Sequence, residues 1–514
     1  MNGAESLVRT LIAGGVKTCF TNPGTSEMHI VAALDGMPEM RCVLGLFEGV
    51  VTGAADGYGR IAEKPACTLL HLGPGLANGL ANLHNAKRAR VPILNVIGQH
   101  ATKHLQFDTP LKSDIEAIAR PYCKWLRTAR TASEIGVDAA DAIRAACEAP
   151  AGIASLIVPA DVAWSEGGAV EKIAAIPGAP LAANETIERV AAMLRSDRPT
   201  AILLDGNALY GKGLTAAGRI AAATKARLFA PYPFPRLERG AGRPVVERIA
   251  YIFEQAVEQL KEIRQLILVG ASPPISYFAH PSKKSAPTSP ECEIVTLAHP
   301  GEDYAGSLEA LTAALSLNAH PYESENPERP AMQRGNITAS GIAAGLGALL
   351  PEDAILIDES MTSGRGIMSA TKGCPPHDLL ANTGGSIGIA MPLAVGAAVA
   401  RPGRRVLALS ADGSGMYTAQ ALWSMARENL DVTTVIFANR EYAVLKREFS
   451  ALVGGSPGPR ATALFEIGNP ELDWVALAKA LGVPGTRPGD LEAFNDALRE
   501  SLASKGPSLI EVRL

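Results

Sequence analysis

Two polar residues lie at the ends of two apolar runs that predict buried strands. Asp412 follows the apolar run "VLALSA", and Asn439 follows the apolar run "VTTVIFA", 27 residues after Asp412. An amphipathic segment separates the two runs, so the stretch predicts one strand–helix–strand unit. Right-handed crossovers bring the carboxyl ends of parallel strands to the same edge of a sheet. We therefore expect the carboxylate of Asp412 and the amide of Asn439 to converge on one point.

The segment "DGSG" that begins at Asp412 adds a second feature to this edge. It opens a helical pattern, and free N–H groups at such a position suit a phosphate. A carboxylate and an amide oxygen beside a phosphate describe a Mg²⁺ site, because Mg²⁺ prefers octahedral oxygen with few protein ligands. A tight turn at Asp412 and a strand-end cap at Asn439 explain the same residues without a metal. These residues by themselves leave both interpretations open.

The stretch from residue 406 to residue 442 resembles the cofactor-binding motif of thiamine diphosphate (ThDP) enzymes. That motif begins Gly-Asp-Gly and ends Asn-Asn, whereas this chain reads Ala-Asp-Gly at its start and Ala-Asn at its end. Both departures fall on residues that flank the metal-binding positions. The resemblance implies that Mg²⁺ is held by Asp412, Asn439 and the backbone carbonyl of Glu441.

Other parts of the chain carry the same resemblance. Residues 22–34 and 44–99 resemble the N-terminal pyrimidine-binding domain of benzoylformate decarboxylases and acetolactate synthases. Residues 383–400 resemble the start of the diphosphate-binding domain of the same enzymes. The similarity covers almost all of 1–165 and 336–514, and the middle of the chain matches only in type.

The resemblance implies further contacts to the cofactor, made by Ser360, Thr362, Ile387, Gly413, Ser414 and Tyr442. Ser360 and Thr362 follow the strand pattern "AILI", where hydroxyl residues of the relatives touch the diphosphate. Ile387 would lie under the cofactor and bend its two rings into a V shape. Simple core packing is the alternative interpretation of Ile387.

Three residues of the N-terminal region are candidates for proton transfer. Glu48 opens a helical pattern, where the helix dipole by itself favours an acidic residue. The resemblance gives this position to the catalytic glutamate that hydrogen-bonds the aminopyrimidine ring of ThDP. His71 and Thr25 match active-site positions held by a His and a Ser in benzoylformate decarboxylase. Such an imidazole and hydroxyl relay protons, although a His at a strand end is usually only a hydrogen-bonded side chain.

The candidates for the substrate pocket rest on weaker signals. They are Gln99, His100, Phe107, His280, Val444 and Leu445. Gln99 and His100 follow a predicted strand, and His280 lies in a proline-rich loop, 272–290, of a length that is often functional. Val444 and Leu445 belong to a helical pattern after Asn439, and core packing explains these two equally well.

The resemblance implies decarboxylation of a small-molecule 2-oxo acid, with or without carboligation to a second carbonyl compound. Acetolactate synthases carry Phe-Gln before an acidic residue, Thr and Pro, whereas this chain reads Gln-Phe at Gln106 and Phe107. Cleavage or ligation of an acyloin or an acyl-CoA with the same cofactor is an alternative. A cofactor-binding homologue without catalysis is an alternative of another class. No feature of the chain demands FAD.

The elements that position these residues are predicted by alternating apolar runs and helical patterns, which indicate βαβ units and mostly parallel sheets. We expect an α/β protein of three doubly wound domains. Two stretches rich in Gly, Pro or polar residues read as linkers, at 165–180 and 319–335. The expected domains are a pyrimidine-binding domain (1–165), a Rossmann-like central domain (180–318) and a diphosphate-binding domain (336–514).

Composition excludes several other classes of function. A net charge of -4 offers no basic surface for nucleic acid. No run of 18 apolar residues predicts a membrane span, and the N-terminal segment reads as a capped amphipathic helix and lacks the pattern of a secretory signal. Seven cysteines without a CxxC pair indicate a reducing compartment, and we expect the cytoplasm. The resemblance implies a homodimer at the least, and we expect a homotetramer.

Overall fold

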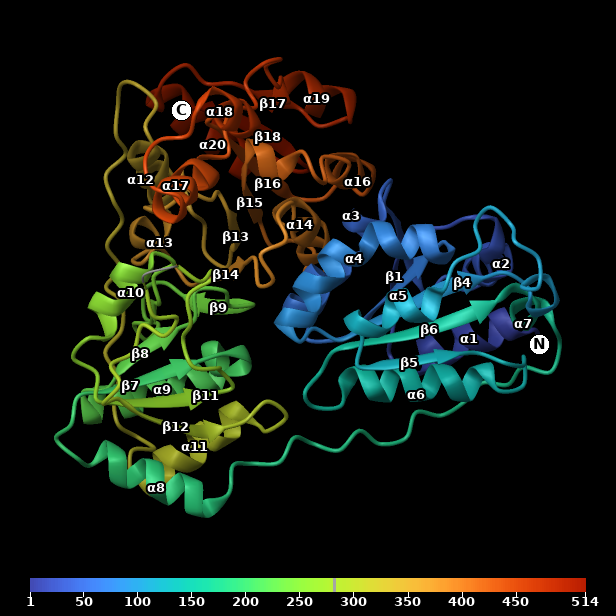
Figure 1. The fold of residues 1–514 in the computed structure, drawn as a ribbon, viewed down its shortest axis with the longest axis horizontal. Coiled ribbons are helices and arrows are strands. Elements are labelled where there is room, and N and C mark those ends of the chain that lie inside the picture. Colours follow the sequence, from blue (N-terminus) through green and yellow to red (C-terminus); the bar gives the residue numbers. More distant parts are fainter. Residues whose placement is uncertain (281–282) are drawn as a thin grey trace.

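The computed structural model describes residues 1–280 and 283–514 of the chain. Within them the strands form three sheets, one in each third of the chain, and helices cover the sheets (Figure 1). Almost all strand pairs are parallel. The expected α/β class with mostly parallel sheets is therefore confirmed.

The N-terminal sheet has the strand order β2-β1-β3-β4-β6-β5. Its strands are β1 (Thr18–Asn22), β2 (Arg41–Leu44), β3 (Ala66–Leu70), β4 (Ile93–Gln99), β5 (Trp125–Thr128) and β6 (Ile153–Pro159). Its helices are α1 (Gly3–Ala13), α2 (Met28–Asp35), α3 (Glu48–Ala62), α4 (Leu72–Ala89), α5 (Ile115–Ala119), α6 (Ile135–Cys147) and α7 (Ala160–Trp164). Asn2 and Glu5 form a reciprocal capping box at the start of α1, as the sequence predicts.

The central sheet has the order β10-β8-β7-β11-β12. Its strands are β7 (Thr200–Leu204), β8 (Arg227–Ala230), β10 (Glu247–Arg248), β11 (Gln265–Val269) and β12 (Glu293–Ala298). The helices around it are α8 (Asn184–Leu194), α9 (Gly211–Thr224), α10 (Phe253–Leu260) and α11 (Tyr304–Ala314). Residues 165–183 contain no helix or strand and run as an extended trace from the N-terminal part to α8 (Figure 1).

The C-terminal sheet has the order β17-β18-β16-β15-β13-β14-β9. Its strands are β9 (Arg236–Arg239), β13 (Ile355–Glu359), β14 (His377–Ala381), β15 (Val406–Ala411), β16 (Val432–Ala438), β17 (Gly485–Thr486) and β18 (Ser508–Arg513). The helices are α12 (Ala339–Leu349), α13 (Ile367–Ala370), α14 (Ala390–Ala400), α15 (Asp412–Gly415), α16 (Ala421–Arg427), α17 (Ala443–Leu452), α18 (Pro459–Phe465), α19 (Trp474–Ala480) and α20 (Leu491–Ala503). β9 comes from the central third of the chain and pairs antiparallel with β14.

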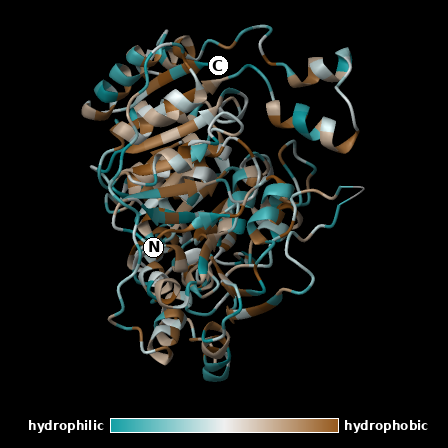
Figure 2. Ribbon diagram, turned by 90° about the vertical axis from the view of Figure 1, so that its left-hand side faces the viewer, coloured by the Kyte–Doolittle hydropathy of each residue, from teal (hydrophilic) through white to brown (hydrophobic). Residues whose placement is uncertain are grey.

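The buried apolar side chains are shared between the three parts. One cluster runs from Phe20 of the N-terminal sheet to Ile436 of the C-terminal sheet, and another joins Ile202 of the central sheet to Leu407. Figure 2 shows hydrophobic segments concentrated in the inner strands, with hydrophilic segments mainly on outer helices and loops. Burial of apolar surface therefore holds the parts against one another as well as stabilising each.

Helices α3 and α14 make the contact between the N-terminal and C-terminal parts that matters most for the site (Figure 1). A Cβ at Gly57 of α3 would lie 2.2 Å from the carbonyl oxygen of Leu393. A Cβ at Gly396 of α14 would lie 1.9 Å from the carbonyl oxygen of Ala54. Glycine at both positions lets the two backbones approach. Because Glu48 begins α3 and Ile387 precedes α14, this contact links two predicted site regions.

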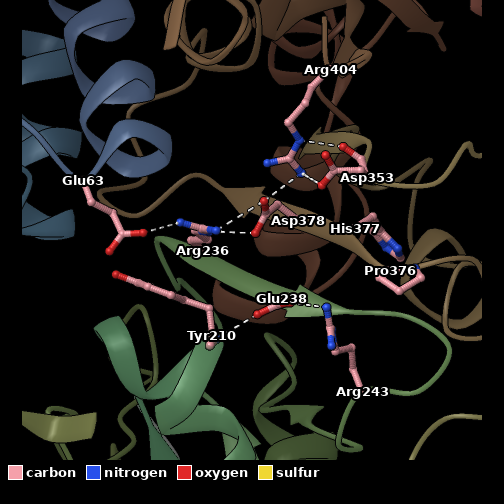
Figure 3. A pocket seen from close by; sticks show the side chains of 11 residues that line it. Glu63, Tyr210, Arg236, Glu238, Arg243, Asp353, Pro376, His377, Asp378 and Arg404 are labelled. Atoms are coloured by element: carbon pink, nitrogen blue, oxygen red, sulfur yellow. Dashed lines mark hydrogen bonds and ion pairs between the residues drawn. The ribbon is translucent and has the colours of Figure 1, made fainter. Parts of the chain in front are cut away.

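A polar cavity of about 240 Å³ lies where the three parts meet. Figure 3 shows Arg236 of β9 between Glu63, at the end of α3, and Asp378 of β14. Arg404 bridges Asp378 and Asp353 on the other side of the cavity. Both arginines are paired with carboxylates, so their positive charges are neutralised. We interpret this cavity as a junction between domains.

No helix among the described residues is long and apolar enough to cross a membrane.

Candidate active site

The carboxyl ends of β15 and β16 bring the two predicted metal ligands together. The strands are parallel neighbours in register, so Asp412 and Asn439 follow at the same edge of the sheet. One carboxylate oxygen of Asp412 accepts the backbone N–H of Arg440 at 2.7 Å. The side-chain oxygen of Asn439 accepts the backbone N–H of Glu441 at 3.2 Å. The structure thus places both residues at the same edge of the sheet, as the strand–helix–strand pattern predicts.

Asp412 is buried without a cationic partner among the described residues. Its other oxygen accepts the N–H of Gly413 at 2.9 Å. Burial raises the pKa of Asp412, and the backbone N–H groups of Arg440 and Gly413 oppose that rise. Bound Mg²⁺ would supply the missing positive charge. The described residues contain no cluster of three or more His, Cys, Asp or Glu side chains that could hold a metal ion.

The space beside Asp412 is shaped by the predicted cofactor contacts of the same strand ends. A Cβ at Gly413 would lie 2.6 Å from Cε1 of Tyr442, so the tyrosine ring packs directly on this glycine. Ser414 is buried in the same turn. The side chain of Glu441 pairs with Lys446, and its backbone carbonyl is the group predicted for the metal.

Ser360 and Thr362 follow β13, which pairs with β15 at the same edge of the sheet. The backbone N–H of Ser360 donates to Asp358 at 3.1 Å, and the Ser360 hydroxyl donates to the same carboxylate oxygen. This hydroxyl is therefore already engaged, while Thr362 is half-buried in the turn that follows. The residue before Ser360, Glu359, is fully buried, and burial raises its pKa to about 7.

Glu48 occupies the first position of α3 and is 6% exposed. One carboxylate oxygen accepts the side-chain amide of Asn22 at 3.1 Å, and the other accepts that of Asn78 at 2.9 Å. Two neutral donors, at the end of β1 and on α4, therefore fix the carboxyl group. A Cβ at Gly75 would lie 3.4 Å from the first oxygen of Glu48 and 3.3 Å from Cβ of His71, so this glycine lies close to both.

His71 lies between β3 and α4, as the N-cap of α4, and belongs to a hydrogen-bonded group with Glu27 and Ser26. Its Nδ1 lies 2.8 Å from Oε2 of the fully buried Glu27. The hydroxyl of Ser26 lies 3.3 Å from the same nitrogen and donates to Oε1 of Glu27 at 2.7 Å. A proton on Nδ1 facing the carboxylate leaves Nε2 available to another partner. Thr25 is exposed, so the structure places Ser26, and not Thr25, against the imidazole.

Gln99 is the last residue of β4, and His100 follows it. The side-chain oxygen of Gln99 accepts the N–H of His100 at 2.8 Å. Burial lowers the pKa of His100, and the nearby His104 and His71 lower it further. Strands β3 and β4 are parallel neighbours in register, so their carboxyl ends lie side by side. Phe107 stands further out and is 54% exposed.

A cavity of about 230 Å³ separates the described part of the loop 272–290 from α17. Tyrosines 251 and 277 form part of its wall, with ring centroids 5.3 Å apart, and His280 lines it as well. Nδ1 of His280 is buried and has no hydrogen-bond partner among the described residues. Arg447 and Glu448 of α17 close the cavity from the C-terminal side. His280 thus faces the helix that follows Asn439.

Val444 and Leu445 lie on the first turn of α17, where no residue is buried. Leu445 is 45% exposed, and neither residue borders the cavity. Core packing is therefore the wrong interpretation of these two side chains in the single chain. The positions of α17 that do reach the cavity come later in the helix, at Arg447, Glu448 and Ala451.

Sequence reasoning missed several groups that hold the candidate residues, namely Asn22, Glu27, Asn78, Asn85 and Glu359. Asn22 and Glu359 end buried strands, which is the same signal that singled out Asp412. Glu27 follows the "NPGTS" turn without a periodic pattern, and Asn78 and Asn85 lie in a helix whose partners are distant in sequence. Only the fold shows what they contact.

Two family descriptions match the chain. The thiamine pyrophosphate enzyme N-terminal TPP binding domain matches residues 1–118, and the C-terminal TPP binding domain of the same enzymes matches residues 366–512. A Mycobacterium tuberculosis protein provisionally named acetolactate synthase large subunit IlvX is 51% identical over 517 residues, which cover 100% of this chain and 99% of the relative. Benzoylformate decarboxylase of Pseudomonas aeruginosa is 29% identical, over 97% of this chain and 96% of the relative.

Solved structures of similar fold cover the chain from end to end. The ThDP-dependent 4-hydroxybenzoylformate decarboxylase of Rhodococcus jostii has a TM-score of 0.85 at 24% identity, over 100% of this chain and 99% of that one. Benzoylformate decarboxylase of Polynucleobacter necessarius has a TM-score of 0.82 at 22% identity, with the same coverage. The sequence matches and the shared fold lead to one conclusion: the chain belongs to the thiamine diphosphate-dependent enzymes, in the group that contains acetolactate synthases and benzoylformate decarboxylases.

Proposed function

We propose that the chain is a ThDP- and Mg²⁺-dependent decarboxylase of a 2-oxo acid, with carboligation as a possible second outcome of the same reaction. The observation that carries this proposal is the His71–Glu27 pair beside Glu48. Loss of CO₂ must be followed by delivery of a proton to the carbon that carried it, and an imidazole held by a buried carboxylate is a suitable donor.

Residues of two sheets would hold the cofactor. Asp412, Asn439 and the carbonyl of Glu441 would bind Mg²⁺, and Glu48 would bind the aminopyrimidine ring. When bound, ThDP supplies a nucleophilic carbon and an electron sink for the loss of CO₂. The carboxyl group of Glu48 is held by the side-chain amides of Asn22 and Asn78, which fixes its position at the start of α3.

His71 would move a proton at Nε2. Glu27 holds Nδ1, which fixes the tautomer and the orientation of the ring. His100 lies near enough for its pKa to be lowered by His71, and it belongs to the same polar wall. Thr25 stays a predicted catalytic residue, and Gln99 and Phe107 stay predicted pocket residues. Thr25 and Phe107 are exposed in the single chain.

We assign the side chain of the substrate to the cavity between the loop 272–290 and α17. Tyrosines 251 and 277 offer aromatic faces, and Arg447 and Glu448 offer polar groups. Two relatives of this chain are named for benzoylformate or its 4-hydroxy form, which are aromatic 2-oxo acids. An aromatic 2-oxo acid with a polar substituent fits the character of these walls.

An acetolactate synthase-type carboligase is the second candidate. The relative at 51% identity carries that name, and it matches the chain over its full length. Such an enzyme would consume a 2-oxo acid and release an acetohydroxy acid in place of an aldehyde. Cleavage or ligation of an acyloin or an acyl-CoA with the same cofactor remains an alternative prediction. We expect no requirement for FAD.

A panel of aliphatic and aromatic 2-oxo acids tests this proposal. The purified chain is incubated with ThDP and Mg²⁺, and CO₂, aldehyde and ligated product are measured for each acid. We expect CO₂ and aldehyde from aromatic acids, and complete loss of both after treatment with EDTA. Acetohydroxy acid as the main product would favour the second candidate. No turnover of any acid together with no exchange of the C2 proton of ThDP would mark a homologue without catalysis.

We propose a homodimer at the least, and a homotetramer as the working assembly. In the single chain α17 and α18 contain no buried residue, and Leu445, Leu452, Val453 and Leu464 are exposed on this segment. A second copy that covers this surface would complete the site. We further propose the domain boundaries 1–165, 180–318 and 336–514, and a cytoplasmic location, which suits seven unpaired cysteines.

A further inference from the structure

Two residues from different parts of the chain hydrogen-bond to the segment that carries Ile387, mainly through the backbone of that segment. We name residues 382–389, between β14 and α14, the Ile387 loop. One side of this loop meets Glu359 of the C-terminal sheet, and the other meets Asn85 of α4 in the N-terminal part. We propose that Glu359 and Asn85 are positioning residues that together set the place of Ile387, an inference that rests on the proposed cofactor role of Ile387.

Glu359 binds the C-terminal end of the Ile387 loop. Its carboxylate accepts the N–H groups of Gly388, Ile389 and Ala390, each at 3.0 Å, and the side-chain amide of Asn382 at 3.3 Å. These N–H groups lie at the start of α14, where helices leave donors unsatisfied. No cation among the described residues pairs with Glu359, so the carboxylate is buried at a cost that only these donors offset.

Asn85 binds the other end of the loop. Its side-chain amide donates to the carbonyl of Ser386 at 2.9 Å, and its side-chain oxygen accepts the N–H of Ser386 at 3.3 Å. Its backbone carbonyl also accepts the hydroxyl of Thr383 at 2.7 Å. A Cβ at Gly384 would lie 2.5 Å from the side-chain oxygen of Asn85, so the loop passes against this side chain. The side chain of Asn85 therefore bonds both backbone groups of Ser386, its N–H and its carbonyl.

Ile387 lies between the two held residues. Ser386 before it is fixed by Asn85, and Gly388 after it is fixed by Glu359 and adopts a left-handed conformation with φ of 89°. The carbonyl of Gly388 accepts the hydroxyl of Thr418 at 2.7 Å, which fixes the same peptide from a third direction. The Ile387 side chain itself is only half-buried. Its direction is thus set by the backbone, which suits a side chain that must stand rigidly against a bound molecule.

The N-terminal part of the same chain therefore takes part in building the diphosphate half of the site. Besides Asn85, the ring of His84 contacts the carbonyl of Gly384 at 3.1 Å, and Arg60 donates to Thr383 at 3.1 Å. These contacts join residues about 300 positions apart in the chain. Removal of Asn85 would loosen the loop without touching a cofactor contact.

The test compares Asn85→Ala with a matched control, Asn95→Ala. Asn95 is equally buried and makes two side-chain hydrogen bonds, with Thr68 and Ser155, but it lies in β4 away from the loop. Both variants lose a buried amide and we expect a similar fall in the melting temperature of the cofactor-free protein. Hydrogen–deuterium exchange of residues 384–390 is then measured in that protein. We expect exchange to rise by about tenfold or more in Asn85→Ala only.

A second measurement reports on the cofactor. Exchange of the C2 proton of ThDP is followed at saturating ThDP and Mg²⁺ in wild type, Asn85→Ala, Ile387→Ala and the double variant. We expect each single change to slow exchange by about tenfold, and the double variant to be no slower than Ile387→Ala, because both act through one side chain. Glu359→Gln, which keeps the shape of the side chain, should fall between wild type and Asn85→Ala.

Loop exchange in Asn85→Ala equal to that in Asn95→Ala would overturn the proposal, as would additive effects of Asn85→Ala and Ile387→Ala. The proposed decarboxylase activity fails separately. If the wild type exchanges the C2 proton but releases CO₂ from no 2-oxo acid, the reaction is wrong and the positioning role stands. If wild type shows no C2 exchange, the loop measurement in the cofactor-free protein still decides whether Asn85 holds the loop.

Discussion

At the scale of single residues, the site depends on carboxyl groups whose surroundings differ. Glu48 is bound by two side-chain amides, Asp412 by backbone N–H groups, Glu27 by an imidazole and Glu359 by a helix N-terminus. Burial raises the pKa of Asp412 and that of Glu359, and backbone N–H groups oppose the rise at both. The tasks that we propose for these carboxyl groups differ as their partners do.

Replacement of Glu48 tests the first of these tasks. We expect Glu48→Gln to slow C2 proton exchange of bound ThDP by about a hundredfold or more, because an amide cannot carry the proton that the carboxyl group moves. Binding of ThDP should change much less, since the amide keeps the shape of the side chain. Nuclear magnetic resonance of acid-quenched ThDP measures the exchange. An unchanged rate would remove Glu48 from the catalytic group.

The buried carboxyl of Glu359 predicts a pH dependence of stability. Burial raises its pKa from 4.5 to about 7. Between these values the folded chain keeps a proton that the unfolded chain has released, so this contribution to stability is lost as pH rises. The wild type should lose up to about 3 kcal/mol of unfolding free energy relative to Glu359→Gln between about pH 5 and about pH 8. Urea unfolding of both proteins measures this difference, and a constant difference would contradict the prediction.

At the scale of elements, the pairing of α3 with α14 links two predicted site regions. α3 begins at Glu48, and α14 begins where Glu359 and the Ile387 loop meet. The backbones approach through Gly57 and Gly396, so any side chain there must push the helices apart. The position of each half of the site therefore depends on the absence of a Cβ at these two points.

Gly396→Ala tests this contact. Its Cβ would lie 1.9 Å from the carbonyl of Ala54, so we expect a loss of about 1–3 kcal/mol in unfolding free energy, as in other overpacked cores. Weaker binding of ThDP should accompany the loss, because α3 and α14 shift. Gly178→Ala is the control, since a Cβ at Gly178 meets no atom within 4 Å. Equal stability of the two variants would show that the helices adjust freely.

At the scale of the whole molecule, Arg236 joins the three parts of the chain. It pairs with Glu63 at 3.1 Å and with Asp378 at 2.7 Å, and its guanidinium stacks on Tyr210 of the central part at 4.4 Å from the ring centroid. Arg236 belongs to β9, which leaves the central part of the chain and completes the C-terminal sheet. The junction fixes how the N-terminal and C-terminal parts meet.

We expect Arg236→Ala to lower the unfolding free energy by about 3 kcal/mol, because it leaves the buried Asp378 with one cation fewer. Arg499 pairs with Asp496 on the surface, so Arg499→Ala should cost less than about 1 kcal/mol. Thermal unfolding compares the two variants. A cost for Arg236→Ala no greater than that of the surface control would show that apolar contacts alone hold the junction.

The fold was largely readable from local patterns. Apolar runs predicted inner strands such as β13, β15 and β16, because a strand buried on both faces needs a continuous apolar stretch. Strands β14 and β18 were missed although they are buried, because charged or polar residues interrupt their apolar stretches. Strands β5, β9 and β10 were missed because they are short or half-buried. Strands with few buried side chains leave little trace in composition.

The sequence by itself determined the class of fold, the family and the shared sheet edge of Asp412 and Asn439, because strand ends that follow a regular crossover are fixed by local periodicity. Tertiary structure alone decided the rest. It placed Ser26 instead of Thr25 against His71, brought Asn85 to the Ile387 loop, and aimed Arg447 rather than Val444 at the cavity. These outcomes depend on the angles at which separate elements pack, and no local pattern encodes an angle between elements distant in sequence.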